Sequence, residues 1–344
     1  MAYRITLKPS GHTYEVQEGQ NILQAGLEAG HMMPYSCRAG VCRTCRGTVL
    51  EGKVDYGLAH ETYLPRSDRA KGLALLCQAK PLTDLTVEVR EVHGVRPRII
   101  PCRVERMEKP APDVAVLGLR LPMNENFRFL AGQYIDILLK GGKRRSYSLA
   151  TRPDPAGVTA LEIHVRHTPG GAFTDQVFST LKVRDLLRFE GPLGSFYLRE
   201  ESEKPIILLA SGTGFAPIRA IAEYAAEKKI ARPITLYWGG RLKRDLYQFD
   251  IAAAWPHVKF IPVLSDEKWE GRMGFVHRAV MEDFPDMSGH QVYACGAPIV
   301  IDSARRDFSA QCRLPAEEFY ADSFITEADK AATPWEEPCR RRER

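Results

Sequence analysis

The chain has 344 residues, a length that allows two or three domains, each with a buried core of its own. Apolar residues make up 44% and charged residues 26%, which excludes an intrinsically disordered chain. A formal net charge of +5 is small for this length, so neither nucleic acid nor a membrane surface is predicted as a partner.

Targeting and membrane-spanning segments are not predicted. The N-terminus runs directly into an alternating strand pattern, without the charged head and apolar core of a secretory signal. No stretch approaches the roughly 20 apolar residues needed to cross a bilayer. Eight cysteines in such a chain indicate metal binding or catalysis before disulfides. We therefore predict a soluble, cytoplasmic protein.

The first predicted domain spans residues 1–93 and contains both strands and a helix. Strand-like runs at Tyr3–Leu7 and His12–Val16 precede a short helix, and the alternating run Leu85–Arg90 closes the domain. Residues 94–98 are predicted to be a linker, because Gly and Pro occur there among polar residues.

The second predicted domain, residues 99–202, consists of short strands separated by turn residues, a spacing typical of a β-barrel. The expected strands are Val114–Leu121, Tyr134–Leu139, Leu161–Arg166 and Leu186–Glu190, with one helix at Ala172–Leu181.

The third predicted domain, residues 203–330, alternates apolar strand-like runs with helical stretches. This alternation predicts a parallel sheet with helices on both faces. Its strands are expected at Ile206–Ala210, Ile234–Trp238, Lys259–Leu264 and Gln291–Ala294. Residues 331–344 are predicted to be a disordered tail.

Four cysteines form the most specific pattern in the chain. Cys37, Cys42 and Cys45 follow the spacing C-x4-C-x2-C, and Cys77 lies 32 positions further on. A structural zinc site and buried thiols are the alternatives, but zinc sites usually combine C-x2-C with a second short pair. With the segment 34–40, this spacing resembles plant-type ferredoxins. The resemblance implies a β-grasp fold and a [2Fe–2S] cluster bound by all four cysteines.

Two motifs in the second domain suggest a phosphate-bearing cofactor. The first is Arg145-Ser-Tyr147-Ser148, which alone could be an ordinary strand end. The second places Gly170, Gly171 and Thr174 directly before a predicted helix. Backbone N–H groups and a helix N-terminus can bind a pyrophosphate there, whereas the simpler alternative is a helix cap formed by Thr174.

Two further motifs lie at strand ends of the third domain. Gly212-Thr213-Gly214 and Pro217 connect an apolar strand to a helix, whose first turn tolerates a proline. Cys295-Gly296 follows a later strand. Taken singly, the first could be a simple strand-to-helix joint and Cys295 a buried thiol.

The order of these motifs resembles the ferredoxin–NAD(P) reductase family with an N-terminal ferredoxin domain. The resemblance implies a six-stranded antiparallel FAD-binding barrel and a parallel-sheet NAD(P)-binding domain. It assigns a flavin phosphate contact to Arg145. The catalytic site is assigned to Tyr147 against the isoalloxazine, Ser148 near N5 and Cys295 near the nicotinamide C4. Phe324 is expected beside the flavin or within the core.

The resemblance also implies an electron-transfer enzyme. Hydride from NAD(P)H reduces FAD, and single electrons leave through the cluster to a partner protein. NADH is favoured and NADPH stays open, because Lys243 and Arg244 could hold a 2′-phosphate or be surface charges. Two groups share this layout: CDP-6-deoxy-Δ3,4-glucoseen reductases and reductase components of bacterial aromatic oxygenases. The predicted acceptor is therefore a pyridoxamine-phosphate (PMP) sugar dehydratase or an oxygenase component. A monomer is predicted; the alternative function is a redox-sensing or electron-storage module with negligible turnover.

Overall fold

The computed structural model describes residues 2–61, 63–92 and 95–324. These residues form two compact units, the smaller unit (2–92) and the larger unit (95–324). The predicted tail and Gly94 of the predicted linker lie outside the described residues. A strand begins at Arg98, inside the predicted linker, and the domain boundaries themselves stay predictions.

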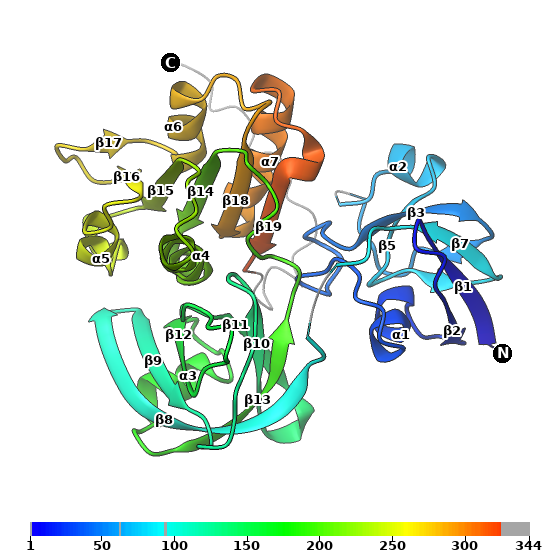
Figure 1. Ribbon diagram of the computed structural model, residues 1–344, viewed down its shortest axis with the longest axis horizontal. Coiled ribbons are helices and arrows are strands. Elements are labelled where there is room, and N and C mark those ends of the chain that lie inside the picture. The colour runs from blue at the N-terminus through cyan, green and yellow to red at the C-terminus, as the bar shows by residue number, and fades with distance from the viewer. Residues whose placement is uncertain (1, 62, 93–94, 325–344) are drawn as a thin grey trace. The chain divides into compact units, whose positions relative to one another are not determined.

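The smaller unit is a mixed sheet with the strand order β2-β1-β7-β3-β5 (Figure 1). β1 pairs antiparallel with β2 and parallel with β7. Helix α1 begins after Asn21, whose Oδ1 accepts a hydrogen bond from the Gln24 amide at 2.8 Å. Its buried residues include Ile22 and Leu23. The elements are β1 (Ala2–Lys8), β2 (Thr13–Gln17), α1 (Ile22–Glu28), β3 (Arg46–Glu51), β4 (Val54–Asp55), α2 (Arg66–Ala70), β5 (Leu73–Leu75), β6 (Lys80–Pro81) and β7 (Leu85–Glu88).

The larger unit begins with a six-stranded antiparallel sheet in the order β11-β10-β13-β8-β9-β12, as predicted. Its edges meet through a single bridge between Leu149 and Ile163, so the ladder does not close fully into a barrel. The predicted helix is present but shorter. The elements are β8 (Arg98–Ala111), β9 (Val114–Arg120), β10 (Tyr134–Leu138), η1 (Lys140–Gly142), β11 (Arg144–Ser148), β12 (Ala160–Arg166), α3 (Thr174–Ser179) and β13 (Leu186–Leu193).

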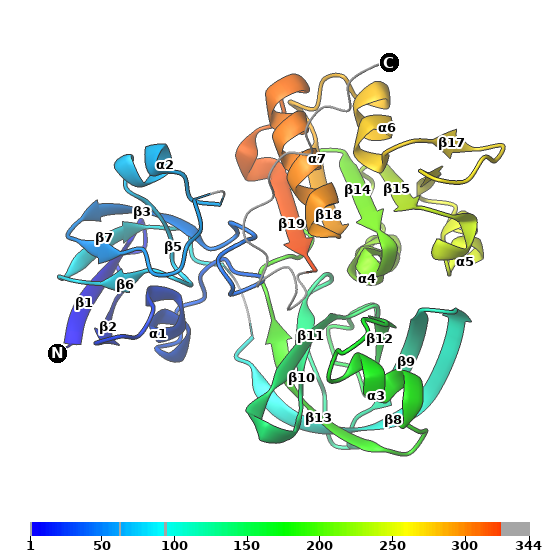
Figure 2. The ribbon, with the colours of Figure 1, turned by 180° about the vertical axis from the view of Figure 1, so that it is seen from behind.

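The second half of the larger unit is the predicted parallel sheet, with the order β17-β16-β15-β14-β18-β19 (Figure 2). The strands are β14 (Ile206–Ser211), β15 (Ile234–Gly240), β16 (Lys259–Leu264), β17 (Arg272–Met273), β18 (Gln291–Gly296) and β19 (Phe319–Ser323). The helical elements are η2 (Gly212–Gly214), α4 (Phe215–Glu227), η3 (Lys243–Asp245), α5 (Phe249–Ala253), α6 (Val276–Asp283), α7 (Pro298–Gln311) and η4 (Ala316–Glu318).

An apolar core lies on each face of this sheet, one beneath α4 and the other beneath α6 and α7. Alternate strand residues point to opposite faces, so Leu208 packs with α4 whereas Leu209 packs with α6 and α7. Helices therefore cover both faces, as predicted, and the loops at the carboxyl ends of the strands are left to form a site. Within the described ranges, no helix is long and apolar enough to cross a membrane.

Candidate redox sites

The four predicted cluster ligands lie together in the smaller unit. Cys42, Cys45 and Cys77 are buried and Cys37 is half-buried. The thiol of Cys37 hydrogen-bonds to Cys42, which raises the pKa of Cys37 and lowers that of Cys42. Cys45 and Cys77 form a second pair, in which the pKa of Cys45 is raised and that of Cys77 lowered.

The loop around these sulfurs fits an iron–sulfur cluster. The Ala39 amide donates to Sγ of Cys37 at 3.3 Å, and Gln78 Nε2 donates to Sγ of Cys77 at 3.8 Å. Such donors stabilise the negative charge of a bound thiolate cluster. Gly40 has φ +80°, and a β-carbon there would lie 2.8 Å from the Gln78 side chain. A glycine is therefore required for the turn.

The motif Arg145-Ser-Tyr147-Ser148, called the flavin motif below, lies in the edge strand β11. The ring of Tyr147 lies 5.3 Å from that of Phe173, and burial raises the pKa of its phenol. The guanidinium of Arg145 donates to the carbonyl of Arg144 at 2.8 Å. Ser148 is buried, with its side chain on the opposite face of the strand from Tyr147.

The predicted pyrophosphate loop folds beside this strand, since Phe173 belongs to it. The Gly170 amide donates to the Asp175 carboxylate at 3.0 Å, and Thr174 Oγ1 donates to the carbonyl of Thr168 at 2.8 Å. Thr174 therefore does not cap α3 with its side chain. A β-carbon at Gly171 would lie 2.4 Å from Thr174 Oγ1, so the loop requires a small residue there.

The motifs Gly212-Thr213-Gly214 and Cys295-Gly296, called the nicotinamide motifs below, come together at the carboxyl ends of β14 and β18. These two strands are paired neighbours. A β-carbon at Gly214 would lie 2.1 Å from the carbonyl oxygen of Cys295, and one at Gly296 would lie 2.4 Å from that of Ser211. Trp238 Nε1 donates to the carbonyl of Gly212 at 3.1 Å. Neighbouring Thr213 and, in the first turn of α4, Pro217 are buried.

The flavin and nicotinamide motifs meet at Asp322 of β19. The Ser148 hydroxyl donates to its Oδ2 at 3.4 Å, and Cys295 lies opposite it in the β18–β19 register. Burial and the Asp322 charge together raise the pKa of the Cys295 thiol well above its ordinary value. Phe324 packs partly buried against the core of the parallel sheet, and its amide donates to the Gly296 carbonyl at 2.9 Å.

Sequence reasoning did not single out Asp322, because its place depends on the pairing of strands far apart in the chain. Of its neighbours, the sequence singles out only Phe324, which is expected beside the flavin or within the core. The register that sets Asp322 against Cys295 has no local sequence signal.

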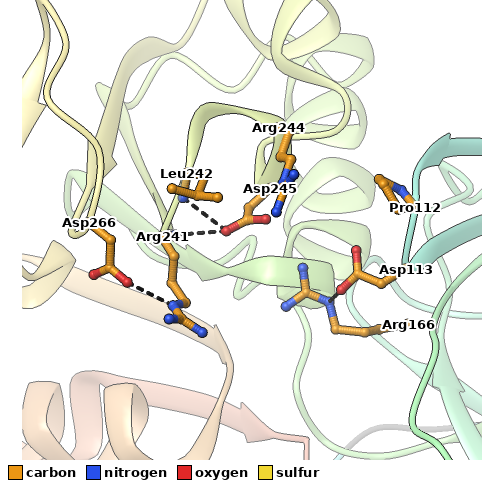
Figure 3. A pocket seen from close by; sticks show the side chains of 8 residues that line it. All are labelled: Pro112, Asp113, Arg166, Arg241, Leu242, Arg244, Asp245 and Asp266. Carbon is orange, nitrogen blue, oxygen red and sulfur yellow. Dashed lines mark hydrogen bonds and ion pairs between the residues drawn. The ribbon is translucent and has the colours of Figure 1, made fainter.

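A cavity of about 430 Å³ opens at the same carboxyl edge (Figure 3). Arg166 Nε lies 3.2 Å from the Asp113 carboxylate, and Arg241 Nε donates to Asp266 at 2.8 Å. Arg166 also approaches Gly212, whose β-carbon would lie 2.9 Å from the guanidinium. The lining residues are Pro112, Asp113, Arg166, Arg241, Leu242, Arg244, Asp245 and Asp266.

Three family models match successive parts of the chain. They are a 2Fe-2S iron-sulfur cluster binding domain at residues 5–82, an oxidoreductase FAD-binding domain at 101–197 and an oxidoreductase NAD-binding domain at 208–306. The fold and the sites thus define an oxidoreductase. Along the sequence, its FAD-binding domain lies between the iron–sulfur domain and the NAD-binding domain.

Known proteins are similar to this chain over nearly its whole length. The chain is 39% identical to a CDP-6-deoxy-L-threo-D-glycero-4-hexulose-3-dehydrase reductase of Yersinia pseudotuberculosis, over 94% of this chain and 99% of that one. It is 35% identical to reductase component 2 of a terephthalate 1,2-dioxygenase of Comamonas, over 95% and 98%. Among solved structures, the cytochrome P450 reductase GcoB of Amycolatopsis matches with a TM-score of 0.75 and 36% identity, over 94% and 98%.

The chain belongs to the family of NAD(P)H-dependent iron–sulfur flavoprotein reductases. The predicted [2Fe–2S], FAD and nicotinamide cofactors are confirmed by the matched domains. The reductase relatives support turnover and do not support the alternative of a redox-sensing or electron-storage module. The roles of individual site residues stay predictions.

Proposed function

We propose that this reductase takes hydride from NADH at the Ser148–Asp322–Cys295 junction and delivers single electrons to a separate acceptor protein. The observation that carries the proposal is the convergence of the flavin and nicotinamide motifs on one buried carboxylate. Ser148 and Asp322 are 174 positions apart, and each motif alone has a simpler interpretation.

The antiparallel sheet supplies the residues proposed to hold FAD. Arg145 offers a guanidinium to a phosphate, and Tyr147 offers an aromatic ring that excludes water. The amides of Gly170 and Gly171 lie before Thr174, where a pyrophosphate would compete with the Asp175 carboxylate for the Gly170 amide. Bound FAD supplies the chemistry that converts a two-electron hydride donor into a source of single electrons.

Cys295 is proposed to shape the hydride-transfer pocket as a neutral thiol. Its raised pKa keeps the sulfur protonated at neutral pH, so it is neither a nucleophile nor an added charge beside the nicotinamide. Asp322 is proposed to orient the Ser148 hydroxyl by accepting its hydrogen bond. Phe324 is proposed to line the same pocket, because its amide donates a hydrogen bond to the Gly296 carbonyl.

The cavity beside Gly212 favours NADH over NADPH. Three arginines and three aspartates line it, and two of the arginines are already paired with aspartates. A 2′-phosphate would need surplus positive charge, which this balanced set does not provide. We expect kcat/KM to be at least about tenfold higher for NADH. Asp266→Asn releases Arg241 and is expected to shift the ratio toward NADPH, whereas equal use of both by the unchanged protein would contradict the NADH assignment.

The proposed acceptor is the predicted PMP-dependent sugar dehydratase, since the Yersinia relatives are named as reductases of a CDP-6-deoxy-hexulose 3-dehydrase. An oxygenase component is the second candidate, supported by the Comamonas relative and by the structural similarity to a P450 reductase. NADH consumption is measured with each purified acceptor and its substrate. Coupled turnover with the dehydratase supports the first candidate, and turnover with only the oxygenase replaces it. Cys45→Ser serves as a control that removes a cluster ligand. The monomeric state and cytoplasmic location stay predictions.

A further inference from the structure

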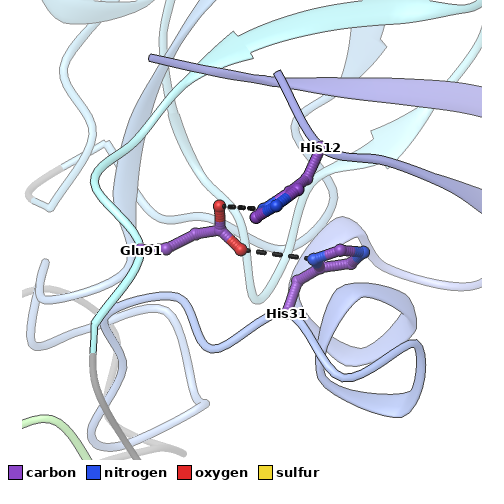
Figure 4. A group of neighbouring side chains, drawn as sticks. All are labelled: His12, His31 and Glu91. Carbon is purple, nitrogen blue, oxygen red and sulfur yellow. Dashed lines mark hydrogen bonds and ion pairs between the residues drawn. The ribbon is translucent and has the colours of Figure 1, made fainter. Parts of the chain in front are cut away.

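Three side chains of the smaller unit that are not among the predicted cluster ligands lie together (Figure 4). His12 lies in the turn between β1 and β2, His31 follows α1, and Glu91 follows β7. The three segments are distant in sequence, and the fold brings their side chains to one place.

The Glu91 carboxylate lies between the two imidazoles. Its Oε2 is 2.7 Å from Nδ1 of His12, and its Oε1 is 3.2 Å from Nδ1 of His31. One nitrogen or oxygen from each side chain lies within 4.8 Å of the other two. The imidazole rings are 5.1 Å apart and tilted by 32°.

The backbone holds these side chains in place. The Val92 amide donates to the Met32 carbonyl at 2.6 Å, which fixes the Glu91 segment against the His31 segment. The Leu7 amide donates to the His12 carbonyl at 2.8 Å, which closes the turn. The side chains of His31 and Glu91 are only 19% and 17% exposed, whereas that of His12 is 58% exposed. The cluster is therefore largely buried at His31 and Glu91 and open to solvent at His12.

Two imidazole nitrogens and one carboxylate oxygen form a donor set that zinc uses when a fourth position is left to water. Imidazole also favours zinc over magnesium or calcium, which prefer oxygen ligands. We propose that His12, His31 and Glu91 bind a Zn²⁺ ion that joins the β1–β2 turn, the end of α1 and the exit of β7. Each imidazole would bind the ion through Nδ1 as its Nε2–H tautomer, and water completes the coordination.

Zinc binding is tested on the full-length protein loaded with FAD and its cluster. Zn²⁺ is titrated calorimetrically while the visible absorbance of the cluster is followed, because cysteines released from a damaged cluster would also bind zinc. The expected result is one saturable site in the unchanged protein. His12→Asn and Glu91→Gln are each expected to weaken it at least about tenfold, since even loss of a residue that only supports a ligand has such an effect. His290→Asn, at another half-buried histidine, should keep the original affinity.

A second measurement does not depend on the affinity itself. A bound ion that links three segments of the folded unit raises the temperature at which the cluster absorbance is lost. Zn²⁺ should therefore raise this temperature in the unchanged protein and in His290→Asn, but not in His12→Asn. Absence of a saturable site in the unchanged protein, or equal affinity in all variants, would overturn the proposal. NADH oxidation does not depend on this site, so the two proposals fail separately.

Discussion

Replacing Glu162 with glutamine is expected to weaken the junction between the two sheets of the larger unit. Glu162 lies on β12, and its Oε1 accepts from Arg219 of α4 at 2.6 Å and lies 2.9 Å from Nε2 of His164. Its Oε2 accepts from Arg106 at 2.5 Å. The other ring nitrogen of His164 lies 2.7 Å from the hydroxyl of Tyr247, so the network joins the antiparallel sheet to the parallel-sheet half at two points.

The size of the effect follows from the pKa of Glu162. Burial alone would raise this pKa, but the hydrogen bond from His164 and the charges of Arg219 and Arg106 lower it from 4.5 to about 2. A lowered carboxyl pKa gives stability that is present above pH 4.5 and is lost as the pH falls toward 2. The difference corresponds to about 3 kcal/mol at neutral pH, of which about 1 kcal/mol is lost by pH 4. Burial also lowers the pKa of His164, so its protonation below pH 6.5 destabilises in the same direction.

We therefore expect Glu162→Gln to lower the free energy of unfolding by about 2 to 3 kcal/mol at pH 7, because it removes the buried charge that faces Arg219, His164 and Arg106 and leaves Arg219 with Glu223 alone. Denaturant unfolding followed by tryptophan fluorescence measures this, since the described residues Trp238, Trp255 and Trp269 all lie in the parallel-sheet half. Unfolding of the two units is fitted separately.

The matched control is Glu108→Gln. Glu108 accepts from the same Arg106 at 3.0 Å, but its side chain is 57% exposed, so the change should cost less than about 0.5 kcal/mol. If both variants lose the same small amount, the buried network does not contribute as argued. If the free energy of unfolding of the unchanged protein rose as the pH falls from 7 to 4, the predicted direction of the pH dependence would be wrong.

Three further outcomes follow from the redox sites. Ser148→Ala should slow anaerobic flavin reduction by NADH roughly tenfold to hundredfold while FAD stays bound, and an unchanged stopped-flow rate would rule out its assigned role. Cys45→Ser should abolish cytochrome c reduction but keep NADH–ferricyanide activity, whereas loss of both would show that the flavin depends on the cluster. Gly214→Ala places a β-carbon 2.1 Å from the Cys295 carbonyl and should raise the KM for NADH at least about tenfold, so a normal KM speaks against this close packing.

Features with a local cause could be predicted from the sequence. The run Ile206–Ala210 is continuously apolar because β14 is covered on both faces, and the structure extends it only to Ser211. The spacing of Cys37, Cys42 and Cys45 likewise reflects one tight loop around Gly40, whereas Cys77 comes from a distant segment. In both cases neighbouring residues carry the whole signal.

Strand β8 was not predicted, although it is the longest strand of the antiparallel sheet at 14 residues. Its inward residues Ile100, Cys102 and Val104 alternate with exposed ones, but Pro101 and Pro110 interrupt the pattern and charged residues fill its second half. Prolines ordinarily indicate a turn, and the pairing with β9 and β13 outweighs that local preference.

The convergence on Asp322 also decides between two kinds of flavoprotein chemistry. A cysteine beside a flavin can act as a nucleophilic thiolate only when nearby cations or amide donors lower its pKa. Cys295 has the opposite surroundings, since it is fully buried and faces a carboxylate across the β18–β19 pair. Its thiol therefore stays protonated, which agrees with its proposed role of shaping the hydride-transfer pocket and argues against a thiol–disulfide relay. The one-electron chemistry is then assigned to the cluster proposed at the four cysteines of the smaller unit, where the sulfurs of Cys37 and Cys77 accept an amide and a side-chain hydrogen bond.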